Sequence, residues 1–254
     1  MTVFRYDKSL EGLLTCIFDA YSRRSFPEQL ISLTEPLPMF AGETHEVITE
    51  HAKAERVWTG LERKLTRPVC GMLIHVWLSE LPGSDELLMR YIFKAFNTSE
   101  SIATNFADTD VLEVKKVAAK VSREREQLTQ FVRFQKAADG IFFAPVSPIY
   151  NALPLSLDYF TNRFADQQWL IYDLKRRYGY YYDLATASEV TLDNDEHLLS
   201  GKLNDALMAQ DEKLFQSMWR DYTISLAIRQ RLNPALQRQH MPRRFWKYMP
   251  EKNQ

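Results

Sequence analysis

The chain has 254 residues, of which 45% are hydrophobic and 26% charged, so it can bury a sizeable core as one large domain or two small ones. Only 8 residues are glycine, which argues against long flexible linkers and against a glycine loop that cradles phosphates. The net charge of −1 argues against a whole-protein field that would attract nucleic acid or an anionic membrane.

The first predicted elements are a short strand at "TVFRY" and a helix that starts after Ser9, a favourable N-cap residue. Apolar residues recur in this helix at three- and four-residue spacing from Leu10 to Tyr21. The proline-containing segment "FPEQLISLTEPLPMFAGE" predicts a loop. Further helices are predicted from about Thr49, over "VCGMLIHVWLSEL" and over "DELLMRYIFKAF", the last with Ser84 as its cap.

The second half begins after the polar segment "NTSESIATNFADTD", which we interpret as a linker, and opens with a long helix from Val111. That helix keeps one apolar face as far as Phe134. Beyond Gly140 the pattern predicts a strand at "GIFFAPVS" and then a helix at "SLDYFTNRFAD". A β-hairpin of "QQWLIYDL" and "GYYYDLA" follows, with "SEVTL" as a third strand. The last predicted helix is "LFQSMWRDYTISLAI", which is over by Asn233-Pro234.

These elements predict an α+β fold that is mostly helical with a small central antiparallel sheet. The division that we expect is a mainly helical region over residues 1–105 and an α+β region with a basic C-terminal segment over residues 106–254, although one continuous domain fits the same pattern.

The sequence also predicts a cytoplasmic location. Cys16 and Cys70 are the only cysteines, and two isolated cysteines suit a reducing compartment. The start "MTVFRYDKSLEGLL" lacks the basic and apolar regions of a signal peptide. No run of 18 uncharged apolar residues is present, so we expect no contact with a membrane.

Charge is distributed unevenly along the chain. Residues 1–110 have a net charge of −5 and residues 111–254 a net charge of +4. From Tyr222 to Pro250 there are six basic residues and no acid. Cations neutralise phosphates and flat rings stack on unpaired bases, so the stretch "QRQHMPRRFWKYMPE" is a candidate for nucleic-acid binding. Its candidate residues are Arg238, His240, Arg243, Arg244, Trp246, Lys247 and Tyr248.

The same stretch has a purely structural alternative, a C-terminal tail that docks on its own protein. Phe245 and Trp246 would then fill an apolar groove, because large aromatic side chains bury readily. The arginines would pair with acids elsewhere, for which "DLATASEVTLDNDE" is a suitable run. We favour burial for the two rings and phosphate contact for Arg243 and Arg244.

The turn of the predicted hairpin is the second basic candidate. Lys175, Arg176 and Arg177 would project from it and could enter a groove or contact a phosphate. A solvated charged turn explains the same residues equally well.

Catalytic and metal-binding patterns are weak. No histidine or cysteine has a ligand partner at zinc spacing, so we expect no metal site. The only candidate catalytic groups are carboxylates near the predicted sheet, since one well-placed aspartate can position water for glycosyl-bond hydrolysis. Aspartates at strand and helix ends more often serve as caps or turn formers. The four candidates are Asp158, Asp166, Asp173 and Asp183.

Several stretches together resemble one bacterial family of DNA metabolism or DNA repair proteins. They are "LLTCIFDAY", "LSELPG", "FVRF…DGIFFA…P…Y…LPL" over 131–155 and "RLNPALQRQHMPRRFWKYMPE" over 231–251, with "RFADQQWLIYDLKRRYGYYYD" between the last two. The resemblance implies a gene neighbour that is a radical-SAM protein related in outline to spore photoproduct lyase. In some members it implies fusion to a uracil-DNA glycosylase-like domain. An iron–sulfur cluster and S-adenosylmethionine would belong to the partner, and we expect no cofactor in this chain.

We therefore expect a DNA-associated accessory protein of a radical-SAM repair or modification system, which binds nucleic acid, the partner enzyme or both. One alternative is a stand-alone base-excision-type hydrolase, which would need a pocket of aromatic side chains around one of the four aspartates. The other alternative is a protein–protein scaffold without DNA contact. Whether the chain is an enzyme stays open at this stage.

Overall fold

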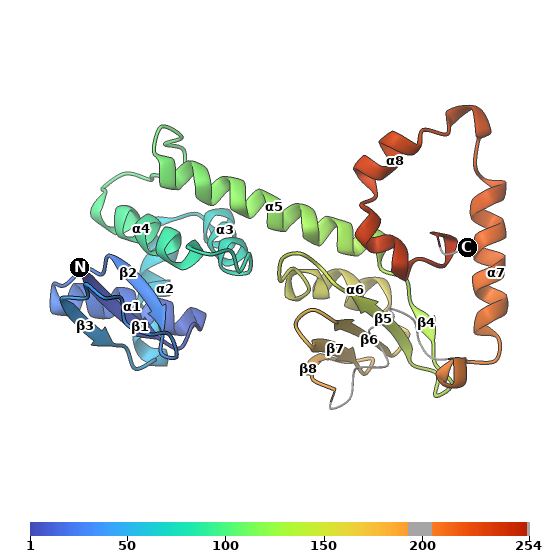
Figure 1. Cartoon of the computed structure of the whole chain (residues 1–254), viewed down its shortest axis with the longest axis horizontal. Coiled ribbons are helices and arrows are strands. Elements are labelled where there is room, and N and C mark those ends of the chain that lie inside the picture. Colours follow the sequence, from blue (N-terminus) through green and yellow to red (C-terminus); the bar gives the residue numbers. More distant parts are fainter. Residues whose placement is uncertain (193–204, 253–254) are drawn as a thin grey trace. The chain divides into compact units, whose positions relative to one another are not determined.

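The computed structural model describes residues 1–192 and 205–252 and divides the chain into two compact units. Unit 1 is Met1–Ser122 and unit 2 is Arg123–Gln254. The division falls inside the long helix α5 (Thr109–Phe131), which is drawn in green in Figure 1. One continuous helix therefore contributes residues to both units.

Unit 1 contains a small parallel sheet whose central strand is β1. In its described residues the strand order is β2-β1-β3, and both neighbours run parallel to β1. Val3, Phe4 and Tyr6 of β1 are all fully buried, as expected of a parallel strand that is covered on both faces. The strands are β1 (Thr2–Tyr6), β2 (Gln29–Ser32) and β3 (Glu43–Glu46).

Helices supply the rest of unit 1. Ser9 caps α1 as predicted, because its hydroxyl oxygen accepts the Gly12 N–H at 2.9 Å. The apolar face of α1 is buried, including Leu13, Cys16 and Ile17. In addition to α5, the helices are α1 (Leu10–Arg23), α2 (His51–Lys64), α3 (Arg67–Trp77) and α4 (Ser84–Asn97).

Two details of unit 1 correct the sequence predictions. The segment predicted as a loop, residues 26–43, contains β2 and ends at the first residue of β3, and Pro27, Pro36 and Pro38 lie outside both strands. Ser84 is the first residue of α4 and not its cap; Gly83 holds the cap position with a left-handed φ of 77°. Cys16 and Cys70 are both buried and form no disulfide.

Unit 2 is built around a mixed sheet. In its described residues the strand order is β4-β5-β6-β7-β8; β5 pairs parallel with β6, and the other pairs are antiparallel. The predicted hairpin and its third partner are confirmed as β6, β7 and β8. The elements up to this point are β4 (Gln135–Lys136), β5 (Phe142–Val146), α6 (Leu157–Arg163), β6 (Trp169–Asp173), β7 (Tyr178–Tyr182) and β8 (Ala187–Val190).

The core of unit 2 is rich in aromatic rings. Trp169 is fully buried and stacks on Tyr182 with ring centroids 5.2 Å apart. Phe134 lies outside α5, contrary to the predicted length of that helix, and packs edge-on against Phe164 at 5.0 Å. These contacts give the sheet an aromatic face against α6.

The last part of unit 2 consists of short helices. They are α7 (Glu212–Ser225), α8 (Pro234–His240), a 3-10 helix over Arg243–Tyr248 and a final turn over Pro250–Lys252. The sequence suggested that Asn233 ends a helix, but the structure places it at the start of one. Its side chain accepts the Leu236 N–H at 3.0 Å and so caps the start of α8.

The fold is α+β and mostly helical, as predicted. The parallel sheet of unit 1 and the parallel β5–β6 pair were not predicted. None of the described helices has the length and apolar character that spanning a bilayer requires.

Candidate functional site

The basic closing stretch is partly exposed and partly built into unit 2. Arg238 and His240 lie on α8 and are exposed, as are Arg243 and Lys247 on the following 3-10 helix. The Lys247 ammonium lies 4.6 Å from the centre of the Tyr248 ring. Arg238 and Arg243 are thus exposed cations of this stretch.

Arg244 is held inside unit 2. Its Nη2 donates to Glu124 Oε2 at 2.6 Å and to Gln127 Oε1 at 2.5 Å, and the Glu124 side chain is only 3% exposed. The partner is thus an α5 carboxylate and not the acidic run that begins at Asp183, of which Asp193, Asp195 and Glu196 lie outside the described residues. This ion pair corrects the expectation that Arg244 faces phosphate.

The aromatic side chains of the closing stretch also differ in their burial. Phe245 and Tyr248 are buried, and Phe245 packs on Phe131 with ring centroids 5.4 Å apart. Trp246 is half-buried; its Nε1–H donates to the Met241 carbonyl, and the Arg243 guanidinium lies 5.8 Å from its ring. Burial removes Tyr248 from the stacking surface that the sequence suggested, whereas Trp246 stays partly exposed.

The hairpin turn is tied down more than the sequence suggested. Arg176 is only 10% exposed and donates to the fully buried Asp173 at 2.8 Å and to the carbonyl of Pro148 at 3.2 Å. Lys175 Nζ donates to the carbonyl of Ile149 at 2.8 Å. Lys175 and Arg177 are exposed, but Arg176 does not project from the turn as predicted.

The four candidate aspartates do not converge on one site. Asp173 and Asp183 lie at opposite ends of the β6–β7 hairpin, since Asp173 pairs with Tyr178 and Trp169 pairs with Tyr182. Asp183 accepts the N–H groups of Thr186 and Ala185, and these bonds lower the pKa of its carboxyl. The remaining two, Asp158 and Asp166, are exposed.

Sequence reasoning missed the most unusual surface of unit 2, which is the apolar face of α7. Phe215, Trp219 and Tyr222 are spaced by four and three residues, so they share one helix face, and their exposed fractions are 56%, 40% and 53%. The rings of Trp219 and Tyr222 lie 5.6 Å apart. Aliphatic side chains widen the exposed face, namely Leu214, Met218 and Leu226. The spacing predicted the helix correctly, but spacing alone does not say whether a face is covered.

A cavity of about 560 Å³ lies between the first half of α7, strand β4, the start of β5 and the residues that follow α5. Glu212 anchors one side of it, because its Oε2 accepts the Lys136 N–H at 3.0 Å. Arg133 anchors another, with its guanidinium 2.8 Å from Glu251 and 5.8 Å from the Trp219 ring. The cavity is lined by Arg133, Phe134, Lys136, Phe142, Asp211, Glu212, Phe215, Gln216, Trp219 and Pro250.

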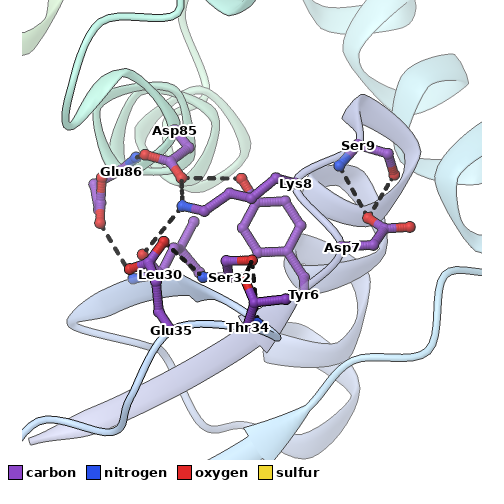
Figure 2. Close-up of polar contacts among 10 residues, drawn as sticks. All are labelled: Tyr6, Asp7, Lys8, Ser9, Leu30, Ser32, Thr34, Glu35, Asp85 and Glu86. Carbon is purple, nitrogen blue, oxygen red and sulfur yellow. Dashed lines mark hydrogen bonds and ion pairs between the residues drawn. The ribbon is translucent and has the colours of Figure 1, made fainter.

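Unit 1 has a polar cluster where β1 ends, which Figure 2 shows. Lys8 Nζ lies 2.5 Å from Asp85 Oδ2, and the Tyr6 hydroxyl donates to the same oxygen at 2.9 Å. Beside them, Glu86 accepts the Leu30 N–H of β2 at 3.3 Å. The cluster therefore ties the start of α4 to two strands of the parallel sheet.

The two carboxyl groups of the cluster titrate differently. Desolvation and the neighbouring Asp85 raise the pKa of Glu86 from 4.5 to about 7. Desolvation acts the same way on Asp85, but hydrogen bonds from Glu86 and Lys8 outweigh it and lower the pKa of Asp85. Asp85 therefore ionises at lower pH than Glu86. We assign the cluster a structural role, since its members bond to one another.

His45, His51 and His75 each contact a polar side chain of unit 1. His45 Nε2 lies 3.0 Å from Asp19, whose carboxylate also accepts from Lys53. Desolvation raises the pKa of Asp19, but these two partners outweigh that effect and lower it. Among the residues that the structure describes, no three His, Cys, Asp or Glu side chains are grouped so as to hold a metal ion.

Comparison with known proteins gives one match. A family model described as a domain of unknown function, DUF4130, matches residues 82–251. The match covers α4, α5 and nearly all of unit 2, but not the parallel sheet of unit 1. No curated protein and no solved structure matches the chain.

Proposed function

The chain belongs to the DUF4130 family, and we propose that it is a DNA-associated accessory protein whose unit 2 binds single-stranded DNA. The observation that carries the proposal is the exposed aromatic face of α7, with Phe215, Trp219 and Tyr222, followed in the chain by a basic stretch without acids. Flat exposed rings are costly to leave in water, and bases of a single strand can cover them by stacking.

The phosphate contacts come from cations that the fold leaves exposed. Arg231, Arg238 and Arg243 are exposed, and within the described residues none of them forms an ion pair. Exposed arginines neutralise phosphates and release counterions, which makes affinity fall with salt. Arg244 has a different role, since it is paired with Glu124 inside unit 2.

Single strands suit this surface better than duplex DNA. Base faces are accessible for stacking only where bases are not paired, and α7 offers rings rather than a row of polar side chains that could read a groove. The three rings rise along one helix face, so successive bases of a flexible strand can reach them.

The accessory role in this proposal is based on the resemblance to DNA repair proteins that are associated with radical-SAM enzymes. The aliphatic residues of the α7 face, Leu214, Met218 and Leu226, favour an additional protein contact there. In this proposal, the radical-SAM partner supplies the redox cofactors and this chain holds the strand. The scaffold without DNA contact is the second candidate, and it is supported by the same aliphatic residues. The dispersed aspartates give the hydrolase alternative no geometric support.

Salt-titrated binding of labelled single- and double-stranded oligonucleotides, followed by fluorescence anisotropy, tests the proposal. We expect tighter binding of the single strand and a log–log salt slope of about −0.7 per phosphate contacted. The triple variant Arg231→Ala, Arg238→Ala, Arg243→Ala should reduce the magnitude of the slope by about 2.

The matched control removes three exposed cations from α5, by Lys115→Ala, Lys116→Ala and Lys120→Ala. It changes the net charge equally and should leave the slope unchanged. Absence of binding by the wild-type chain would exclude DNA contact. Co-purification with the neighbouring radical-SAM protein, with and without DNA, then separates the accessory role from DNA binding alone.

A further inference from the structure

The cavity beside α7 has walls of aromatic rings. Phe134 and Phe142 come from the sheet side, and Phe215 and Trp219 come from α7. Phe134 is held by the aromatic core, since its ring packs against Phe160, Phe164 and Trp169. One side of the cavity is therefore rigid, and the other is a helix face with exposed rings.

Both cations of the cavity have a carboxylate partner within the chain, and the buried Glu212 adds a further carboxylate. Arg133 pairs with Glu251 at 2.8 Å, and Lys136 Nζ lies 3.8 Å from Asp211. The buried Glu212 accepts hydrogen bonds from the Lys136 N–H and from Gln216. A site in which each cation already has a carboxylate partner does not favour a phosphate. It suits a flat, uncharged and largely apolar group.

Gln216 adds a polar group with a defined orientation. Its Nε2 donates to Glu212 Oε1 at 2.8 Å, and because an ionised carboxylate only accepts, this contact fixes which end of the amide faces Glu212. Among the described residues, the Gln216 side-chain oxygen accepts no hydrogen bond. Gln216 lines the cavity, and its amide keeps one acceptor and one N–H for a further partner, which complements the edge of a nucleobase.

We propose that this cavity holds one unstacked nucleobase of a bound single strand, with Trp219 and Phe215 against its faces and Gln216 on its edge. The inference rests on the proposed function, and it adds the place in unit 2 at which a base of the strand binds. The cavity volume of about 560 Å³ lies within the range of small-ligand sites. The alternative occupant is an apolar side chain of a protein partner, which would leave the fixed amide of Gln216 unpaired.

The test compares two labelled single strands of equal length and charge, one with normal bases and one in which every nucleotide is abasic. The ratio of their affinities for the full chain measures the contribution of bases. Trp219→Ala and Phe215→Ala should each lower affinity for the normal strand about fivefold or more and leave affinity for the abasic strand unchanged. Gln216→Leu should act in the same direction.

Ile224→Ala is the matched control, because Ile224 lies on α7 outside the cavity, on the side of the helix opposite Phe215, and is 67% exposed. It should leave the affinity ratio unchanged. The variants change exposed side chains, so far-UV circular dichroism should match that of the wild type.

The outcomes separate this inference from the proposed function. If the normal strand binds and Trp219→Ala has no more effect than Ile224→Ala, strand binding stands and the base site is overturned. If neither strand binds the wild type, both fail. If Trp219→Ala abolishes co-purification with the radical-SAM neighbour while DNA affinity is unchanged, the cavity receives a protein side chain and the base site is overturned.

Discussion

Arg244 and Glu124 form an ion pair of 2.6 Å although 120 positions separate them in the chain. The Glu124 carboxylate also accepts the Ile149 N–H at 2.9 Å through its other oxygen. One nearly buried acid of α5 thus fixes both the C-terminal 3-10 helix and the loop after β5.

Replacing Arg244 should therefore affect stability more than any other cation of the closing stretch. We expect Arg244→Ala to lower the free energy of unfolding by about 2–4 kcal/mol, because it leaves the 3%-exposed Glu124 carboxylate without its cation. Arg243→Ala, the neighbouring exposed residue, should change it by less than about 0.5 kcal/mol. Urea denaturation of both variants measures the difference, and equal stabilities would refute the structural role of the pair.

Gly12 should be intolerant of a side chain. A Cβ there would lie 2.2 Å from Asp7 Oδ1 and 3.0 Å from the hydroxyl oxygens of Ser9 and Thr49. Gly12→Ala therefore displaces the Asp7 carboxylate from its bonds to Ser9 and Thr49 and should destabilise unit 1 by about 1–3 kcal/mol.

Gly71→Ala is the opposite case and serves as its control. Nothing lies within 4 Å of a Cβ at Gly71, inside α3, so alanine should stabilise by about 0.5–1 kcal/mol through its helix propensity. The two substitutions are chemically identical and should shift the thermal midpoint in opposite directions. A gain in stability for Gly12→Ala would contradict the prediction, because it would show that the Asp7 carboxylate can move without a loss of stability.

Glu86 should make unit 1 less stable as the pH rises through neutrality. Its folded pKa of about 7 lies above the ordinary 4.5, so between these values the folded state binds more protons than the unfolded state. The free energy of unfolding consequently falls as pH increases from about 4.5 to about 7. Glu86→Gln should flatten this part of the stability profile, which equilibrium denaturation at several pH values measures. A profile identical to that of the wild type would contradict the assignment.

Asp173 should be a structural and not a catalytic carboxylate. It is fully buried and accepts the N–H of Lys175 and the guanidinium of Arg176. Asp173→Ala removes the carboxylate that pairs with Arg176, whose side chain is 10% exposed, and should destabilise unit 2 by about 2–4 kcal/mol. Because Asp166 is exposed, Asp166→Ala should have little effect on the stability of unit 2. Calorimetry distinguishes them; a stable Asp173→Ala variant would reopen a functional role for this residue.

Local signals predicted the features that depend on neighbours in the chain. Ser9 as a cap, the β6–β7 hairpin and the helix at α7 each follow from residues within a few positions of one another. β2 and β3 were missed because each is only four residues long and gains its stability from pairing with β1, at a distance that periodicity does not register.

The candidate site was harder to predict than the fold because burial depends on tertiary packing. The sequence could not distinguish Arg244, which is paired inside unit 2, from Arg243, which is exposed. It also marked the apolar stripe of α7 without showing that Phe215 and Trp219 stay exposed. Side-chain type and spacing are local properties, whereas exposure is set by residues such as Glu124 that are remote in sequence.

The position of β1 in its sheet has a consequence for synthesis. β1 precedes both of its partners in the chain, yet it is the strand that joins them. On the ribosome, Thr2–Tyr6 emerges before both partner strands and stays without β3 until Glu43–Glu46 has followed. A short apolar strand that waits for its neighbours is a target for chaperones and for misassociation. Slow translation between residues 7 and 42 would prolong that wait.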